Sequence, residues 1–290
     1  MKLRNYLSLL RPPNVFTSVA DVLAGFLYVG GWLDDWITIL LLALISACLY
    51  GAGIAFNDVC DLTRDAVQRP DRPIPSGRVS RSAALLLIGV LVIVALKLSA
   101  LVSSRTLATT GLLVLAIILY DWAVKSTPLA PGVMGCCRAL NVALGMSIVP
   151  LEDNGTAVGP LVLMWFYVTS LTFFARKEGG DSERARLILG TLGVCSAVIG
   201  LALIVPPHRT AHGAYFLFVA ALSASLAYLG IIAIRDRSQP QVQRTVGHFV
   251  MAIILIDLAI AWAARGLVVA TPIALLLVPT LLLRKWFRMT

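Results

Sequence analysis

Long apolar segments separated by short polar ones make up most of this sequence. Runs such as ILLLALISACLY and LLLIGVLVIVAL are uninterrupted, and the longest segments reach the ~20 residues that a helix needs to cross a bilayer. They lack the alternation over ~10 residues that is typical of membrane β-strands. The pattern predicts an all-α polytopic membrane protein, a single transmembrane domain over residues 1–290 with nine or ten spans. The predicted spans are 14–32, 36–56, 82–103, 106–124, 131–150, 158–175, 186–206, 213–234, 246–264 and the short 267–283.

Composition excludes a water-soluble globule and a disordered chain. Hydrophobic residues make up 59% of the sequence and charged residues 13%, about half the usual share of charge. The five cysteines show no metal-ligand spacing, so we interpret them as small buried apolar residues.

The net charge of +9 follows the predicted topology. With the N-terminus in the cytoplasm, most of the 24 Lys and Arg residues lie on the inner side, and only Arg105, Arg209 and Arg265 lie in outer loops. The basicity therefore predicts a multi-pass protein of the cell membrane and not a nucleic-acid partner. Two inner segments, 57–81 and 176–186, carry both signs of charge, so we expect the chemistry at the cytoplasmic mouth.

The second predicted span ends in an acidic cluster, AFNDVCDLTRDAVQ. If the helix continues past Phe56, then Asp58, Asp61 and Asp65 fall within about 60° of arc at 100° per residue. At ~6 Å and an effective dielectric of ~20, each pair of carboxylates repels by roughly 3 kcal/mol, so a cation is needed between them. Mg²⁺ suits this all-oxygen set, which includes Asn57, because it binds one or two carboxylates together with substrate phosphates.

A loop rich in proline and arginine, RPDRPIPSGR, follows the acidic cluster. Its prolines end the helix and stiffen the chain after it. Arg69 lies on the acidic face of the helix, and Arg72 and Arg78 are presented by the loop. Guanidinium groups beside carboxylate-bound metal can clamp a phosphate chain. The simpler interpretation is a solvated charged loop beside a helix cap.

These motifs resemble those of the UbiA family of intramembrane prenyltransferases. NDVCDLTRD followed by RPDRPIPSG is similar to the first aspartate-rich motif and loop of that family. LSLLRPPNVFTSVADVLAGFL resembles its first helix, and YDWAVKSTPLAPGVMGCCRALNVALG resembles its loop between helices four and five. The likeness extends over residues 7–190, and the stretch around Asp21 together with RALNVALG resembles the EboC-type branch.

The resemblance implies a bundle of about nine helices around a cytoplasm-facing cavity. The cavity would bind a Mg²⁺–polyprenyl diphosphate headgroup, with the isoprenoid tail between helices toward lipid. The implied metal and diphosphate ligands are Asn57 and the catalytic acids Asp58, Asp61 and Asp65, with Arg69 and Arg72 beside them and Tyr120 and Lys125 on the diphosphate.

A second aspartate-rich motif, which the resemblance implies at the inner end of the sixth helix, is incomplete. The stretch reads LTFFARKEGGD, with Phe173 and Phe174 where a leading Asp is expected. Glu178 and Asp181 remain as candidate metal ligands. We therefore expect a weakened second metal site, with Arg176 as a candidate substitute cation that contacts the diphosphate.

Charged residues within the spans need a reason, because a charge at mid-bilayer costs ~2.5–3.5 kcal/mol on insertion scales. Arg138 lies about two turns into the fifth span with Asn141 on the same face, and we expect both to bind diphosphate or acceptor. Asp21 fits acceptor recognition, proton acceptance or a structural hydrogen bond. Asp257 belongs to no motif and is predicted to be structural.

Together these features predict an enzyme. It would move a prenyl group from a polyprenyl or other allylic diphosphate to an aromatic or other lipophilic acceptor within the bilayer, with Mg²⁺ as cofactor and release of diphosphate. The alternative is a catalytically degenerate scaffold or carrier of the same fold. The incomplete second motif favours this alternative, and the complete first motif opposes it.

Overall fold

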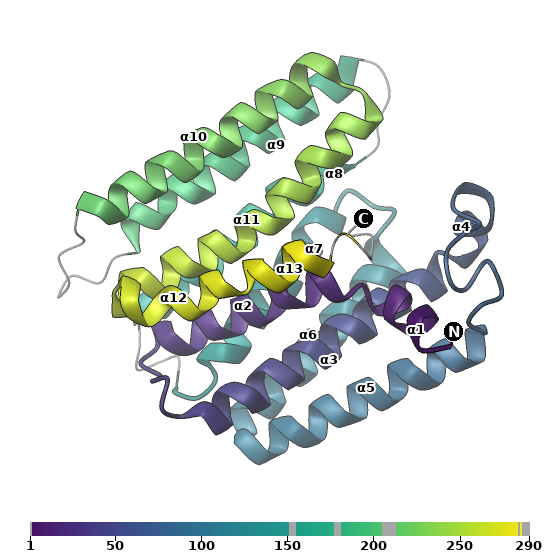
Figure 1. The fold of residues 1–290 in the computed structure, drawn as a ribbon, viewed down its shortest axis with the longest axis horizontal. Helices are drawn as coiled ribbons and strands as arrows, with labels where there is room; N and C mark the ends of the chain where they lie inside the picture. The colour runs from purple at the N-terminus through teal and green to yellow at the C-terminus, as the bar shows by residue number, and fades with distance from the viewer. Residues whose placement is uncertain (1, 151–154, 177–180, 205–212, 284, 286–290) are drawn as a thin grey trace.

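The computed structural model describes residues 2–150, 155–176, 181–204, 213–283 and 285. This part of the chain is all-helical (Figure 1). The main helices are α1 (Lys2–Leu10), α2 (Pro12–Tyr28), α3 (Trp36–Cys60), α4 (Leu62–Gln68), α5 (Arg81–Val102), α6 (Ser104–Ile118), α7 (Ala130–Met146), α8 (Val158–Ala175), α9 (Asp181–Gly200), α10 (Gly213–Asp236), α11 (Gln239–Arg265), α12 (Leu267–Leu275) and α13 (Leu277–Leu283). Short turns η1 (Leu119–Val124), η3 (Gly155–Ala157) and η4 (Leu201–Leu203) adjoin α6, α8 and α9.

Seven helices within the described residues are long and apolar enough to cross a membrane. They are Trp36–Cys60, Arg81–Val102, Ser104–Val124, Gly155–Ala175, Glu183–Leu203, Gly213–Asp236 and Gln239–Arg265. α2 and α7 have 17 residues each, and Leu267–Leu283 is likewise shorter. The structure thus supports a multi-pass membrane fold, while the count of nine or ten spans stays a prediction.

The first predicted span, 14–32, ends earlier than expected. α2 stops at Tyr28, where Gly30 takes a φ of 114° and Gly31 donates its amide to the Phe26 carbonyl (2.9 Å). Glycine adopts this left-handed conformation without steric cost, so the apolar run turns instead of continuing.

α2 occupies the centre of the bundle. It packs against α3, α7, α11, α12 and α13. Helices α8–α11 lie on one side of it, with α11 in contact, and α3, α5 and α6 lie on the other, with α3 in contact (Figure 1). Large apolar side chains on outer helices, such as Leu86, Leu101 and Leu217, are more than two-thirds exposed, which suits a surface that faces lipid.

The backbones of α2 and α7 approach each other closely at two glycines. A Cβ on Gly25 would lie 2.1 Å from the carbonyl oxygen of Val142, and one on Gly145 would lie 2.0 Å from that of Val22. Small residues permit such contact between membrane helices. The contact fixes the register that places polar residues of α7 against α2.

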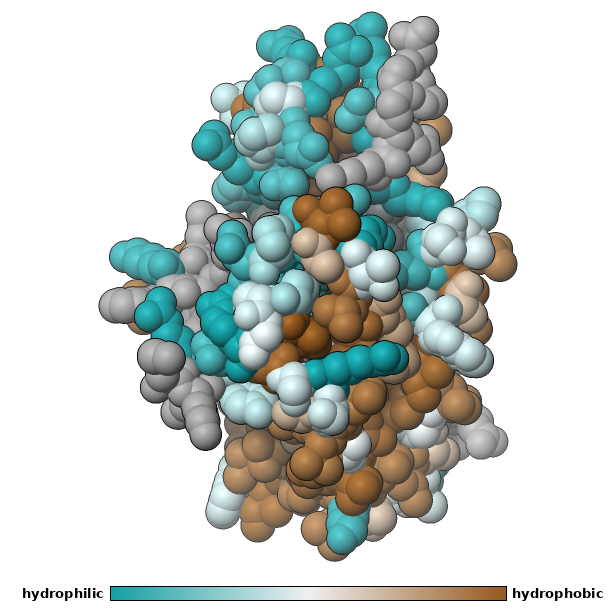
Figure 2. Space-filling model, turned by 90° about the vertical axis from the view of Figure 1, so that its right-hand side faces the viewer, coloured by the Kyte–Doolittle hydropathy of each residue, from teal (hydrophilic) through white to brown (hydrophobic). Residues whose placement is uncertain are grey.

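The charged segments predicted to lie inside gather at one end of the bundle. α1, α4 and the loop after α4 lie at the right-hand end in Figure 1, and Figure 2 views the molecule from that side. Hydrophilic residues cover much of its upper and central area, whereas hydrophobic residues form the lower part (Figure 2). At the opposite end, Arg265 donates to the Leu27 carbonyl in the last turn of α2 (3.2 Å) and to the Gly31 carbonyl after it (3.1 Å).

Candidate active site

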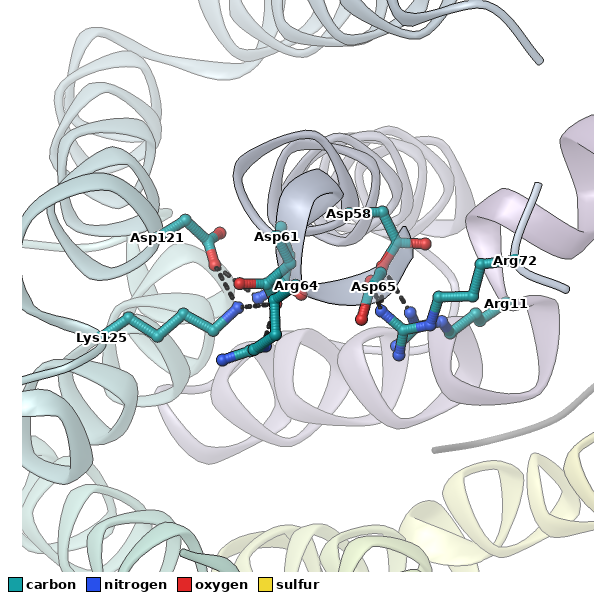
Figure 3. A network of polar contacts seen from close by, with 9 residues as sticks. Arg11, Asp58, Asp61, Arg64, Asp65, Arg72, Asp121 and Lys125 are labelled. Atoms are coloured by element: carbon teal, nitrogen blue, oxygen red, sulfur yellow. Dashed lines mark hydrogen bonds and ion pairs between the residues drawn. The ribbon is translucent and has the colours of Figure 1, made fainter. Parts of the chain in front are cut away.

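The acidic residues after α3 lie on two helices that meet at Asp61. α3 ends at Cys60, Asp61 caps it, and α4 begins at Leu62. Asp58 on α3 and Asp65 on α4 are both buried, with 2% exposure. Asp58 and Asp65 lie beside Arg11 and Arg72, whereas Asp61 lies beside Lys125 and Asp121 (Figure 3). The helical spacing therefore brings Asp58 and Asp65 together, while Asp61 has other partners.

Arg72 bridges Asp58 and Asp65. Its Nη1 lies 3.0 Å from Oδ1 of Asp58 and also pairs with Oδ2 of Asp65. Arg11, between α1 and α2, places its Nη2 2.6 Å from the same oxygen of Asp58. The proline-arginine loop holds Arg72 in place, since Ser76 donates both its amide and its hydroxyl to the Arg72 carbonyl. Two guanidinium groups thus neutralise one pair of carboxylates.

Lys125 contacts a second pair of carboxylates, which consists of Asp61 and Asp121 (Figure 3). Its ammonium group pairs with Oδ2 of Asp61 and lies 3.9 Å from Oδ1 of Asp121. Asn57 donates a hydrogen bond to the same Asp121 oxygen (2.6 Å). Asp121 lies within η1, a π-helical segment at the end of α6, and Lys125 follows it directly. Such segments are frequent at functional sites.

The acids form two pairs, each bridged by a basic nitrogen. Within the described ranges, no group of three or more His, Cys, Asp or Glu side chains is arranged to hold a metal ion. Each pair still offers two carboxylates, with the Asn57 amide oxygen nearby, which is the all-oxygen donor set that suits Mg²⁺ completed by substrate phosphates. The bridging nitrogens of Arg72 and Lys125 stand where positive charge is needed, so the residues present fit a divalent cation.

A pocket of about 330 Å³ lies next to these pairs, with Arg11, Asn57 and Asp121 in its lining. Its mouth is lined by Arg11, Asn57, Tyr120 and Asp121, and its deeper part by Ser18, Ser46, Arg138 and Asn141. Its walls are mostly apolar, with Leu49, Leu113, Ile117, Val168 and Ile253 among them. A polar mouth, apolar walls and a few polar groups inside are typical of a site for an amphipathic ligand.

The polar groups deep in the pocket belong to α2, α3 and α7. Arg138 donates from Nη1 to Oδ2 of Asp21 (2.7 Å) and from Nη2 to Oγ1 of Thr17 (2.8 Å). Asn141 donates to the same Asp21 oxygen and to the Ser18 carbonyl (both 2.8 Å). Arg138 and Asn141 thus lie together on the pocket, as their spacing predicts, and the carboxylate of Asp21 holds both.

Several other predicted site residues lie apart from the acids. Arg69 caps α4, and its side chain is exposed. Loss of solvent around part of the side chain and the nearby charge of Arg72 lower the pKa of Arg69 below its ordinary value, although it stays cationic at neutral pH. Arg176 donates to the Thr127 carbonyl (3.1 Å), which ties the end of α8 to the chain after η1.

The second acidic stretch is only partly described. Glu178 lies outside the described residues, as does the side chain of Asp181, the first residue of α9. Phe174 is fully buried, with its ring 5.2 Å from that of Phe249, and its Cβ would lie 2.6 Å from a Cβ on Gly190. This position is used for helix packing and supplies no metal ligand.

Two residues at the mouth were not predicted from the sequence. Arg11 stands between two helices, directly before the prolines that begin α2, and so belongs to no helical pattern. Asp121 stands between the recognised Tyr120 and Lys125, and its spacing of four residues from Lys125 is the available signal. Arg11 is 47 residues from its partner Asp58, and Asp121 is 64 residues from its partner Asn57. Local sequence patterns do not predict pairs so far apart in the chain.

Comparison with known proteins identifies the family of this chain. The sequence matches the UbiA prenyltransferase family over residues 18–252. It is 37% identical over 154 residues to a digeranylgeranylglyceryl phosphate synthase of Methanopyrus kandleri, covering 51% of this chain and 56% of that protein. The chain spans about half the length of the curated relatives it matches.

Two solved structures share the fold. One, reported for the biosynthesis of digeranylgeranylglyceryl phosphate synthase in membranes, has a TM-score of 0.65 and 21% identity, covering 91% of this chain and 98% of that one. The other is a UbiA homolog from Archaeoglobus fulgidus bound to GPP and Mg²⁺, with a TM-score of 0.57 and 13% identity, covering 89% of this chain and 99% of that one.

Proposed function

Because this chain belongs to the UbiA prenyltransferase family, we propose that it is a prenyltransferase that moves a prenyl group from a polyprenyl or other allylic diphosphate to a lipophilic acceptor. The observation that carries the proposal is a set of ion pairs beside one pocket, in which Arg11 and Asp121 also line the pocket. The paired residues are Asp58, Asp61, Asp65 and Asp121 with Arg11, Arg72 and Lys125. Alternating acids and bases at the mouth of an apolar pocket suit a metal-bound diphosphate attached to an apolar chain.

The acids would hold Mg²⁺, by analogy with the Archaeoglobus fulgidus homolog that is bound to GPP and Mg²⁺. We assign Asp58 and Asp65 to one ion, and Asp61 and Asp121 with Asn57 to a second. This assignment differs from a second site built on Glu178 and Asp181. Bound Mg²⁺ supplies Lewis-acid stabilisation of the departing diphosphate.

The basic side chains would bind the diphosphate itself. Once the acids are occupied by metal, Arg11, Arg72 and Lys125 are free to contact diphosphate oxygens at the same mouth, and Tyr120 lies on the pocket beside them. Fixed positive charges aimed at developing negative charge lower the barrier for cleavage of the bond between C1 and oxygen. Arg69 would add attraction from its exposed position.

The prenyl group would be transferred from the diphosphate to the acceptor within the pocket. The bond between C1 and oxygen breaks, and its electron pair leaves with the diphosphate. The allylic cation is held among apolar side chains, which exclude water. A nucleophilic carbon or oxygen of the acceptor forms the new bond to C1, and its proton passes to the diphosphate or to a carboxylate at the mouth.

The proposed setting is the cell membrane, with the N-terminus and the pocket mouth in the cytoplasm and residues 1–290 as one domain of nine or ten spans. Segments rich in Lys and Arg share the mouth, which supports this orientation. A cysteine at position 78 should react with a membrane-impermeant maleimide only after cytoplasmic access is given, and one at position 33 should react from outside. Labelling of position 78 from outside would reverse the orientation.

A second candidate is a non-catalytic carrier, which the packing of Phe174 in place of an acid favours. The deciding experiment uses purified protein in nanodiscs, allylic diphosphates of several chain lengths and a lipid extract as acceptor source. A prenyltransferase releases diphosphate and forms a prenylated lipid with Mg²⁺ but not with EDTA. Binding of donor without product from any chain length would support the carrier.

A further inference from the structure

Two carboxyl groups lie side by side in the membrane core, beneath the pocket. Asp257 on α11 and Asp21 on α2 are both fully buried, and α11 packs against α2. Their carboxyl groups lie within hydrogen-bonding reach of each other. No donor in the described part of the chain reaches either oxygen of Asp257, or Oδ1 of Asp21.

The lack of donors to both oxygens of Asp257 and to Oδ1 of Asp21 bears on how many protons the two carboxyl groups carry. An ionised carboxylate without a partner is costly in an apolar interior, and two adjacent ones would also repel each other. The nearby cation, Arg138, already forms its ion pair with Oδ2 of Asp21. If Asp257 carries one proton, its O–H donates a hydrogen bond to Oδ1 of Asp21, and the two carboxyl groups then satisfy each other. The cluster of Asp257, Asp21 and Arg138 is then electrically neutral.

The neutral cluster is connected to the pocket through Arg138. Its side chain is 10% exposed and lies on the pocket lining, with its guanidinium carbon 5.2 Å from the centre of the Tyr50 ring. Asp21 and Thr17 fix two of its nitrogens. A guanidinium group only donates hydrogen bonds. When two of its nitrogens are held in this way, its remaining N–H groups are available to donate to an oxygen of a ligand in the pocket.

We propose that the deep end of the pocket is an acceptor subsite for an uncharged hydroxyl or carbonyl oxygen, and that Asp257 is a positioning residue that acts through Asp21 on Arg138. The proposal rests on the prenyltransferase function above and adds to it the chemical class of the acceptor group. An anionic group is disfavoured there, because the charge of Arg138 is already balanced by Asp21. The diphosphate is expected at the mouth instead, where Arg11, Arg72 and Lys125 lie.

The first test is spectroscopic and does not depend on activity. Infrared spectra of the protein in nanodiscs should show the carbonyl stretch of a protonated carboxyl group, shifted in D₂O. Asp257→Asn should remove this band, whereas Asp236→Asn, at an exposed residue of α10, should leave it. A parent protein without the band, or a band that survives Asp257→Asn, would overturn the shared proton.

The second test measures acceptor binding. Protein loaded with Mg²⁺ and an unreactive geranyl thiodiphosphate is titrated calorimetrically with a long-chain alkylglycerol and with its phosphate ester. The neutral probe should bind about tenfold more tightly, and Asp257→Leu should weaken it by about tenfold, in line with one hydrogen bond to a charged group. Asp257→Asn, whose amide donates to Asp21, should bind it nearly as well as the parent.

The outcomes separate the two proposals. Failure of the parent to bind the thiodiphosphate would contradict the proposed function itself. Normal binding of the thiodiphosphate with equal or tighter binding of the phosphate ester, or with no binding of either probe, would overturn the acceptor subsite alone. Equal loss of donor and acceptor binding in Asp257→Leu would show a general structural role.

Discussion

The ammonium group of Lys125 forms an ion pair with Asp61, a residue 64 positions earlier in the chain. This contact joins the end of α3 to the end of the α5–α6 hairpin and brings Asp121 to the same place. A basic side chain thus closes the acidic site across two helices. The same arrangement recurs where Arg72 bridges Asp58 and Asp65. Both contacts have measurable consequences for metal binding and stability.

Removal of one acid from either pair should abolish most activity. Asp58→Ala or Asp61→Ala removes a proposed ligand of the metal that stabilises the leaving diphosphate, and such a loss lowers the rate by about 10²–10³-fold. Mg²⁺-dependent release of diphosphate in nanodiscs measures this rate. Asp236→Asn, an exposed acid on α10, should retain parental activity. Parental rates in Asp61→Ala would remove this residue from the reaction.

Asp121 should matter more than Asp181. Asp121→Asn removes one carboxylate of the Asp61 pair and should weaken Mn²⁺ binding, followed by electron paramagnetic resonance, by about 10–100-fold, the range known for residues that support a metal site. Asp181→Ala should change binding by less than about tenfold, since Phe174 occupies the position of the missing acid. The reverse order would place the second ion on the α8–α9 segment instead.

How far the sequence predicts this site depends on distance along the chain. Asp58, Asp61, Asp65 and Arg72 could be grouped, because helical spacing and a short proline-rich loop bring them together locally. The pairing of Asp21 with Asp257 could not, since it requires α2 and α11 to pack, and apolar periodicity does not identify which membrane helices are neighbours.

The helix count shows a related limit. Hydropathy marks apolar length, but the end of α2 at Tyr28 follows from backbone geometry at Gly30. Interruptions of this kind within an apolar run leave no strong hydropathy signal. Hydropathy therefore predicts the membrane fold securely, and the bounds of the short helices less well.

Arg72 should stabilise the metal-free protein. Arg72→Met leaves Asp58 and Asp65 adjacent without their shared guanidinium, and loss of one partner from a largely buried ion pair costs about 3 kcal/mol. The melting temperature should therefore fall in EDTA and rise again with Mg²⁺, because an ion bound to the folded state stabilises it. Arg235→Met, at an exposed arginine of α10, should melt like the parent. An equal fall with and without Mg²⁺ would contradict the assignment of these acids to a metal.

The close contact between α2 and α7 should be intolerant of a single methyl group. A Cβ on Gly145 would lie 2.0 Å from the Val22 carbonyl oxygen, so Gly145→Ala must separate the helices, at a cost of about 1–3 kcal/mol typical of overpacking. Gly111→Ala on α6 is the matched control, because a Cβ there meets nothing within 4 Å and alanine favours a helix. We expect the first variant to melt at a lower temperature and the second at the same or a higher one.

Because Arg138 and Asn141 reach Asp21 across this contact, Gly145→Ala should also weaken binding of the neutral acceptor probe while binding of the thiodiphosphate at the mouth persists. Parental stability in Gly145→Ala would show that the two helices can separate without cost, and the deep cluster would then not depend on their close approach.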